Sequence, residues 1–326
     1  MKGIKKISLL LVVILLFASL VACTKSEDGQ VVDEGSKVIE QGEENKANGN
    51  GDNNYPLEVE DAFGNLVTLE KAPERIISFA PSHTEILFAL GLGDKVVGVT
   101  SYCDYPEEAL EIERVGDYEG VNYERVIELE PDLIVNYGEL DADSAKIYEE
   151  AGIPVVSYMP ESIDEVIETI EEIALVTGAV EAGEELVNQM TQKRDEIVER
   201  VKDKEPVKVF YEVWHEPLMT AGAGSFVDGL IQLANGINIA RDAEGLYPNY
   251  DLEQLIENDP EVYISSMDLP EKTVEAIASR PGYEEITAIK EGRVYLLDGN
   301  IMSRPGPRIV DALEIMAKAI HPEAFE

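Results

Sequence analysis

The 326-residue chain is poor in basic residues, cysteine, histidine and tryptophan. Lysine and arginine together number 26 against 66 aspartates and glutamates, so the formal net charge is −40 at pH 7. A surface this acidic repels phosphate backbones and anionic headgroups, which excludes nucleic acid and a lipid surface as ligands. The two cysteines are Cys23 and Cys103, and Trp214 is the single tryptophan.

Sequence patterns typical of enzymes are also missing. The chain has no G-x-S-x-G, no H-E-x-x-H and no glycine loop of the phosphate-cradling type. Ser82 and His83 are adjacent in the sequence, which does not bring a base against a nucleophile. Gly222–Ser225 precedes an expected helix and could cradle an anion, but an ordinary strand-to-helix turn explains it better. We therefore expect no catalysis.

The one long apolar run stands near the N-terminus. Three lysines precede the apolar segment 7–20, which has the length of a signal peptide and is short for a membrane span. It ends in Leu-Val-Ala-Cys23, which resembles the lipobox of bacterial lipoproteins; a cleaved signal with an incidental cysteine is the alternative. The resemblance implies that residues 1–22 are removed and that Cys23 is acylated, which leaves no partner for an internal disulfide. Such a lipid would anchor the protein on the extracytoplasmic face of the cell membrane.

Composition divides the rest of the chain. Residues 24–54 are rich in Gly, Asn, Glu, Lys and Ser and nearly free of apolar side chains, so we expect a disordered tether over 23–54. Roughly 270 residues follow, enough for two lobes with cores of their own. We expect an N-terminal lobe over 55–160, a helical segment over 161–204 and a C-terminal lobe over 205–326.

One pattern occurs twice in the chain. Residues 122–135 and 251–264 each predict a helix, a proline-containing turn and a buried strand. In each copy an Asn or Asp lies two residues before a glutamate, Glu124 or Glu253, where it can cap the helix and leave the glutamate in the first turn. The repeat predicts two similar lobes, and a cleft between two lobes is a usual place for a ligand.

Short apolar strands alternate with helices in both halves, which predicts an α/β fold with mainly parallel sheets. A hairpin is expected over 57–69, and helical pattern fills most of 162–204, with Gly178 and Gly183 as the expected breaks. Leu186, Met190, Ile197 and Val201 form one apolar stripe there. A single helix of this length can join the lobes, so we expect little closure on ligand binding. The remaining strands are expected at 75–80, 96–99, 132–136, 153–158, 207–213, 262–265 and 293–297.

Five motifs lie in a consistent order. They are Arg75-Ile-Ile-Ser-Phe-Ala-Pro-Ser-His-Thr-Glu85, Ser101-Tyr-Cys-Asp-Tyr-Pro106, Glu130-Pro-Asp-Leu-Ile-Val135, Gly292-Arg-Val-Tyr295 and Arg304-Pro-Gly-Pro-Arg308. Together they resemble the cobalamin and ferric-siderophore substrate-binding proteins of ABC importers, in the helical-backbone metal-receptor superfamily. The resemblance runs over about residues 57–322, and the tyrosine-rich motif is most similar to cobalamin binders.

The resemblance implies a fold, partners and a ligand class. The fold is two Rossmann-like lobes joined by a single long helix, as in class III-type periplasmic binding proteins. The partners are an ABC permease and its ATPase, and we expect a monomer without a cofactor. The expected ligand is cobalamin or another cobalt corrinoid; a ferric siderophore, or a non-transport role as a surface adhesin or scaffold, is the alternative.

The resemblance also gives the paired glutamates a role. In cobalamin-binding relatives a glutamate at the tip of each lobe docks into arginine pockets of the permease, and the matching residues are Glu124 and Glu253. A carboxylate in the first turn of a helix is favoured by the helix dipole, and two on similar lobes suit a two-fold symmetric partner. Ordinary capping glutamates are the alternative.

Ligand residues are expected where the strands of one lobe end facing the other lobe. Aromatic rings suit a broad, flat macrocycle, although half-buried packing is the alternative for each tyrosine. By resemblance, Tyr102 and the segment 300–304 match positions that touch cobalamin, while Ile301 and Met302 stand where an aromatic pair is expected. The full set is Ser82, His83, Tyr102, Tyr118, Tyr137, Trp214, His215, Tyr247, Asn300, Ile301, Met302, Ser303 and Arg304.

Metal coordination is a further alternative. His83 and His215 each follow the first strand of their lobe, so two imidazoles could face one another and bind zinc, manganese or the cobalt of a corrin. Zinc and manganese receptors of the superfamily need three or four side-chain ligands, whereas this chain has three histidines and His321 is expected at the surface. We therefore predict no metal site, and we expect Cys103 to be a small buried hydrophobe.

Overall fold

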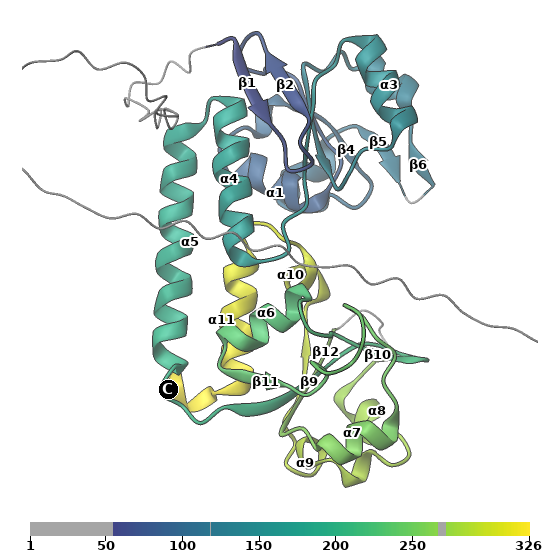
Figure 1. Cartoon of the computed structure of the whole chain (residues 1–326), viewed down its shortest axis with the longest axis vertical. Coiled ribbons are helices and arrows are strands. Elements are labelled where there is room, and N and C mark those ends of the chain that lie inside the picture. Colours follow the sequence, from purple (N-terminus) through teal and green to yellow (C-terminus); the bar gives the residue numbers. More distant parts are fainter. Residues whose placement is uncertain (1–54, 118, 267–271) are drawn as a thin grey trace, which may run out of the picture. The chain divides into compact units, whose positions relative to one another are not determined.

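A computed structural model describes residues 55–117, 119–266 and 272–326 of the chain. Strands and helices alternate there in two α/β lobes (Figure 1). The N-terminal lobe begins with the antiparallel pair β1 (Leu57–Glu60) and β2 (Leu66–Leu69). Gly64 lies in their turn with a φ of +81°, a conformation that glycine adopts without steric cost. The predicted hairpin over 57–69 is confirmed.

The N-terminal lobe is built on a six-stranded sheet in the order β6-β5-β4-β3-β7-β8. Neighbouring strands are parallel except for β5 and β6. Its central strands are apolar on both faces, as expected for a sheet with covered faces. The elements are β3 (Ile76–Ser78), α1 (Pro81–Ala89), β4 (Val96–Thr100), β5 (Arg114–Asp117), β6 (Gly120–Val121), α2 (Tyr123–Glu128), β7 (Leu133–Tyr137), α3 (Ala142–Ala151) and β8 (Val155–Tyr158).

The C-terminal lobe has a sheet in the order β10-β9-β12-β13, and β11 pairs with β9 as well. Its pairs are parallel except for β9 and β10, so the mainly parallel sheets are confirmed in both lobes. The strands are β9 (Val207–His215), β10 (Leu218–Thr220), β11 (Gly236–Asn238), β12 (Val262–Ser266) and β13 (Val294–Leu297). The helices are α6 (Phe226–Leu233), α7 (Leu252–Asn258), α8 (Val274–Ala278), α9 (Thr287–Lys290), α10 (Gly299–Ser303) and α11 (Ile309–Ile320).

The helical segment predicted over 161–204 forms two helices, α4 (Ile163–Thr177) and α5 (Val180–Val201). Gly178 ends α4 in the left-handed conformation with a φ of +76°, which glycine tolerates best. The break expected at Gly183 is wrong, because Gly183 lies inside α5. A Cβ added there would come within 2.4 Å of the Cβ of Ala174, so this glycine allows α4 and α5 to pack closely.

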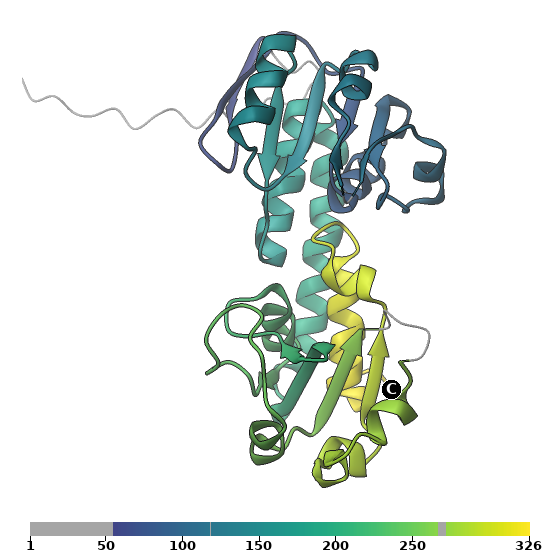
Figure 2. The same cartoon turned by 90° about the vertical axis from the view of Figure 1, so that its right-hand side faces the viewer.

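The single long helix that joins the lobes is therefore α5. It packs against α4, which contacts α1 of the N-terminal lobe, and against α11 of the C-terminal lobe (Figures 1 and 2). In its apolar stripe Met190, Ile197 and Val201 are buried, and Leu186 packs against the same core. One hydrophobic cluster extends from the N-terminal sheet through α4, α5 and α11 to the C-terminal sheet.

His321 was expected at the surface, and this expectation is wrong. Its ring is buried at the end of α11, with Nε2 3.3 Å from the carbonyl oxygen of Asn235. Helix α11 ends at Ile320 with His321 as its C-cap, and because this last turn is buried, the imidazole is buried with it.

Within the described ranges, no helix combines the length and the apolar content that crossing a membrane requires. The predicted signal peptide, the acylation site Cys23 and the predicted tether over 23–54 lie outside the described residues, and so does Tyr118.

Candidate functional site

Four of the aromatic residues predicted for the ligand site are strongly exposed. Tyr102 follows β4 and Tyr137 ends β7, with 52% and 38% of their surface exposed. Trp214 on β9 and Tyr247 after β11 are exposed to 44% and 48%. Other large apolar side chains of the described residues are exposed as well, so the ligand role of these four rings remains a prediction.

Tyr137 and Tyr247 lie within electrostatic reach of one another, although they belong to different lobes. Burial is the main cause that raises the pKa of each phenol, and the carboxylate of Glu161 adds to it in both. The phenol of Tyr247 raises the pKa of Tyr137 further. Both phenols are thus influenced by Glu161, which precedes α4, and their role as ligand residues remains a prediction.

Trp214 and His215 occupy the end of β9, where it turns into β10. The indole Nε1 donates a hydrogen bond to the carbonyl oxygen of Glu216 at 3.0 Å, which fixes the ring locally. His215 is exposed, with Nε2 3.3 Å from a carboxylate oxygen of the same glutamate. The indole N–H is therefore already used, and the ligand contact of Trp214 remains a prediction.

Ser82 and His83 do not stand free at the end of a strand, contrary to the prediction. Helix α1 begins at Pro81, because proline fits the first helical position and its fixed φ starts the turn early. Both residues are buried in the first turn of α1.

His83 is a neutral ring inside the N-terminal lobe. Neither ring nitrogen has a hydrogen-bond partner among the described residues, and burial lowers the pKa of the imidazole to about 3. Its ring centroid lies 5.6 Å from that of Tyr137 and 6.1 Å from that of Tyr158. His83 therefore supports the ring of Tyr137 from behind, and it does not face the exposed His215.

The segment 300–304, expected as a ligand loop, largely belongs to the short helix α10. Asp298 caps this helix by accepting a hydrogen bond from the amide of Asn300 at 2.9 Å. Met302 is fully buried and Ile301 packs against the core, so the predicted ligand contact of Met302 is wrong. Asn300 and Ser303 are exposed and remain predictions.

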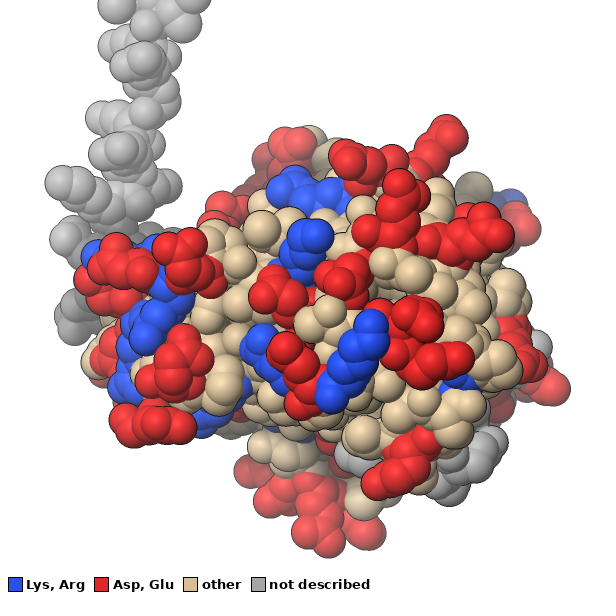
Figure 3. All heavy atoms as spheres, turned by 90° about the horizontal axis from the view of Figure 1, so that it is seen from below, with Lys and Arg blue, Asp and Glu red and all other residues tan. Residues whose placement is uncertain are grey.

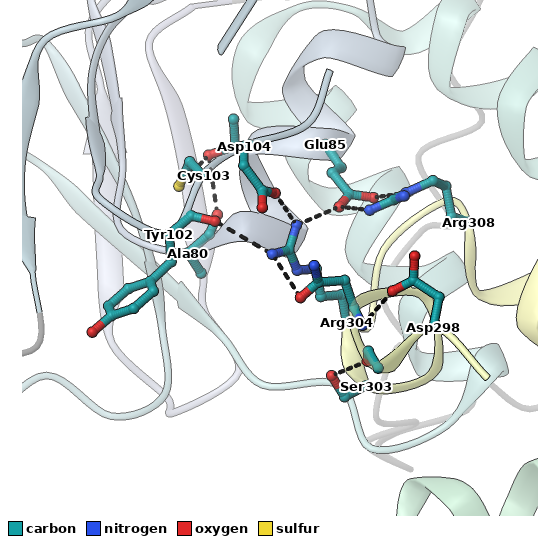
Figure 4. A network of polar contacts seen from close by, with 12 residues as sticks. Ala80, Glu85, Tyr102, Cys103, Asp104, Asp298, Ser303, Arg304 and Arg308 are labelled. Atoms are coloured by element: carbon teal, nitrogen blue, oxygen red, sulfur yellow. Dashed lines mark hydrogen bonds and ion pairs between the residues drawn. The ribbon is translucent and has the colours of Figure 1, made fainter. Parts of the chain in front are cut away.

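Arg304 is held by protein groups on three sides (Figure 4). Its Nη1 lies 2.5 Å from a carboxylate oxygen of Asp104 and 3.5 Å from one of Glu85. Its Nη2 lies 3.0 Å from the side-chain oxygen of Asn300 and 3.4 Å from the carbonyl oxygen of Tyr102. The guanidinium is therefore occupied by partners within the protein.

Arg308, one turn further along the chain, binds the same buried glutamate. It donates two hydrogen bonds to Glu85, of 2.9 and 2.6 Å, in the bidentate geometry that arginine and carboxylate prefer. We call Glu85, Asp104, Arg304 and Arg308 the inter-lobe charge cluster. The sequence analysis did not predict this cluster. The available signal was Glu85, which directly precedes the apolar residues Ile-Leu-Phe of α1, because a buried carboxylate needs a cation.

A cavity of about 630 Å³ lies beside this cluster. Its walls combine the end of α1 with the segment after β4 and with Pro307 and Arg308. None of the predicted ligand residues lines it, so it is separate from the exposed aromatic surface. Cys103, near the same segment, is fully buried between Thr84 and Thr100, which confirms that it packs as a small hydrophobe.

Glu124 and Glu253 occupy equivalent positions in the two lobes. Asn122 caps α2 and Asp251 caps α7, each by accepting a hydrogen bond from the backbone amide three residues on. Both glutamates are exposed in the first helical turn, and neither is in an ion pair with another described residue. Seen from below, the molecule shows more acidic than basic side chains, scattered among wide areas of other residues (Figure 3). The predicted repeat is confirmed, and permease docking remains a prediction.

Among residues 55–117, 119–266 and 272–326, no three His, Cys, Asp or Glu side chains gather in an arrangement that could hold a metal ion.

Comparison with known proteins identifies the family to which this chain belongs. The model of the family described as periplasmic binding protein matches residues 76–301. The chain belongs to the periplasmic binding protein family. This periplasmic binding protein is 36% identical over 280 residues to the "Uncharacterized ABC transporter substrate-binding lipoprotein YvrC" of Bacillus subtilis (strain 168), covering 83% of this chain and 88% of that one. It is 32% identical over 247 residues to a vitamin B12-binding protein of Vibrio cholerae, covering 74% and 87%.

Solved structures agree with the fold of this periplasmic binding protein. A possible iron-binding (periplasmic solute-binding) protein from Staphylococcus epidermidis superposes with a TM-score of 0.69 at 32% identity, covering 77% of this chain and all of that one. The periplasmic vitamin B12 binding protein BtuF of Vibrio cholerae superposes with a TM-score of 0.67 at 31% identity, covering 78% and 98%. The predicted class III-type fold is confirmed.

Proposed function

We propose that this protein is the substrate-binding component of an ABC importer, and that it captures cobalamin or a related corrinoid. The observation that supports this proposal most is the set of exposed rings, Tyr102, Tyr137, Trp214 and Tyr247, contributed by both lobes. A corrin is broad and flat and carries amides at its rim, and aromatic side chains offer such a ligand large area with little loss of side-chain entropy. Binding alone is proposed, without making or breaking bonds.

The charges near this surface favour a corrinoid over the ferric-siderophore alternative. Anionic siderophores need unpaired arginines in the binding site, and Arg304 and Arg308 are the arginines of the motif at 304–308. Both guanidinium groups are engaged by Glu85, and Arg304 by Asp104 as well. Breaking these pairs to bind an anion would leave the buried carboxylate of Glu85 without its counter-charges, which is costly. The resemblance to an iron-binding structure keeps the alternative in the experiment below.

Delivery to the membrane completes the proposal. We infer that Cys23 is acylated and holds the protein on the extracytoplasmic face of the cell membrane, with residues 23–54 as the tether. Glu124 and Glu253, exposed at equivalent helix starts, would dock onto the permease, and the ATPase would supply the energy. Charge-assisted contacts of this kind set register and association rate more than affinity.

Tryptophan fluorescence tests the ligand directly, because Trp214 is the single tryptophan. The chain from Thr24 to Glu326 is titrated with cyanocobalamin, cobinamide and a panel of ferric siderophores, with correction for ligand absorption. Saturable quenching by a corrinoid with a Kd below about 1 μM supports the proposal. Quenching by a siderophore alone replaces the ligand, and no binding to any of them, checked by calorimetry, rejects both.

A further inference from the structure

The Arg304-Pro-Gly-Pro-Arg308 segment links the C-terminal lobe to the N-terminal lobe at a point distant from α5 in the sequence. Arg304 and Arg308 stand between α10 and α11, while Glu85 lies in α1 and Asp104 follows β4. The arginines reach both carboxylates through the contacts shown in Figure 4. The lobes are thus joined twice: by the helices α4 and α5, and by the inter-lobe charge cluster.

Burial makes these pairs strong. The side chain of Glu85 is 2% exposed, and those of Arg304 and Arg308 are 13% and 20% exposed. Solvent screening is weak at such positions, and every oxygen of Glu85 has a guanidinium partner. The guanidinium of Arg308 also lies 3.9 Å above the ring of Tyr105, which adds a cation–π contact.

The backbone is closely packed at the same point. A Cβ added to Gly306 would lie 3.2 Å from the carbonyl oxygen of Ser82 and 3.4 Å from its Cα, so the segment presses directly on the first turn of α1. Pro305 and Pro307 flank this glycine and restrict the backbone on either side. The segment is therefore stiff as well as charged, and a change in the spacing of the lobes would have to break its contacts.

The cluster also holds one residue of the proposed ligand surface. Arg304 approaches the carbonyl oxygen of Tyr102 from the C-terminal lobe, while Arg114 binds the carbonyl oxygens of Thr100 and Cys103, each at 3.1 Å, from within the N-terminal lobe. The peptide that carries the ring of Tyr102 is fixed from both lobes, and the ring itself points away from Arg304 (Figure 4).

We propose that the inter-lobe charge cluster sets the spacing of the lobes in the ligand-free protein and that Arg304 positions Tyr102 for the ligand. The inference about Tyr102 rests on the proposed function, whereas the inference about lobe spacing does not. Fixing a binding surface before the ligand arrives reduces the ordering cost of binding. Arg304 is in this respect a positioning residue, and it acts through Tyr102 and Asp104.

The first test measures the ligand-free protein. Arg304→Ala is compared with wild type by small-angle scattering and by hydrogen exchange, with Arg114→Ala as the matched control. We expect Arg304→Ala to change the scattering profile and to speed amide exchange in α1 from Thr84 onward on the order of tenfold, because each ~1.4 kcal/mol of lost protection is a factor of ten. Arg114→Ala should speed exchange only around Cys103 and leave the scattering unchanged. Unchanged scattering and α1 exchange in Arg304→Ala would overturn the cluster's role in lobe spacing.

The second test measures cyanocobalamin affinity in a double-mutant cycle. We expect Arg304→Ala to weaken binding about tenfold and Arg304→Lys to restore part of the loss, since lysine can still reach Asp104. Adding Arg304→Ala to Tyr102→Ala should cost little beyond Tyr102→Ala alone. Fully additive losses would show that Arg304 does not act through Tyr102.

Two further outcomes separate the inferences. If wild type binds no corrinoid, the proposed function and the role of Tyr102 fail together, and lobe spacing is still decided by the ligand-free measurements. If Arg304→Ala does not fold, Asp104→Asn replaces it, because this carboxylate is half exposed and its loss removes one ion pair with little change of shape. Asp104→Asn should change the scattering profile and the amide exchange of α1 in the same direction as expected for Arg304→Ala, and unchanged values would overturn the proposal.

Discussion

Replacing Glu212 should destabilise the protein more than replacing an exposed glutamate. Glu212 lies fully buried in β9 and accepts hydrogen bonds from Arg280, Tyr263 and Ser265, with the ammonium of Lys272 3.3 Å away. The side chains of Lys272 and Arg280 are only 8% and 15% exposed. Glu212→Gln would deprive both cations of the counter-charge of Glu212, and removing one partner of a buried pair costs about 3–5 kcal/mol. Because glutamine keeps an acceptor oxygen, we expect about 3 kcal/mol.

The pH dependence of this contribution has a defined sign. Burial raises the pKa of Glu212, but hydrogen bonds from Arg280 and Tyr263 and the charges of Arg280 and Lys272 outweigh it and hold the pKa below its ordinary value. The unfolded chain then binds more protons than the folded one below about pH 4.3, so stability is lost as the pH falls through the folded pKa. The Gln variant should lose less stability than wild type on acidification.

Urea unfolding followed by circular dichroism, at about pH 7 and about pH 4, measures both effects. Glu257→Gln is the control, because Glu257 is exposed on α7 of the same lobe and should change the free energy of unfolding by less than about 0.5 kcal/mol. A loss below about 1 kcal/mol for Glu212→Gln, or equal acid sensitivity of the variant and wild type, would refute the reasoning.

Three other variants test separate features. Glu124→Ala with Glu253→Ala should abolish corrinoid uptake by cells while leaving the Kd unchanged; a weaker Kd would place these residues in the ligand site instead. Gly183→Val should lower the free energy of unfolding by about 1–3 kcal/mol, because the added valine side chain would clash with Ala174 where α4 and α5 pack together. An unchanged melting temperature would argue against that close packing. His83→Leu removes a buried imidazole that has no hydrogen-bond partner among the described residues and whose folded pKa is lowered to about 3. The variant should therefore lose less stability than wild type between about pH 7 and pH 4 in chemical unfolding. Equal losses would contradict the burial of a neutral ring.

Much of the fold could be predicted from the sequence because its signals are local. The capping residues Asn122 and Asp251 start helices in both lobes, and apolar runs mark the parallel strands. The two glycines of the helical segment could not be told apart in this way. Gly178 is a helix end and Gly183 a close contact, and only the presence of Ala174 on the neighbouring helix distinguishes the second case.

The candidate site was predictable only in part, for a related reason. Exposure of Tyr102 and Tyr137 follows from their positions at strand ends, which the sequence indicates. The sequence does not indicate where the charged side chains point. Their direction depends on pairings between residues about 200 positions apart, as with Arg304 and Asp104. The burial of Met302 and His83, which are predicted as ligand residues, does not follow from the sequence pattern, because the segments that bury them, α10 and the first turn of α1, are too short to show a period.

The shared hydrophobic cluster has a consequence for how the chain folds. Ile76 and Leu133 of the first sheet belong to the same buried cluster as Val209 and Ile264 of the second, through the residues of α4, α5 and α11. Each lobe also has a smaller buried cluster of its own, but either lobe produced alone would expose the apolar face that normally contacts the shared helices. We therefore expect the two lobes to unfold as one cooperative unit, with a single transition on heating in which both sheets are lost together.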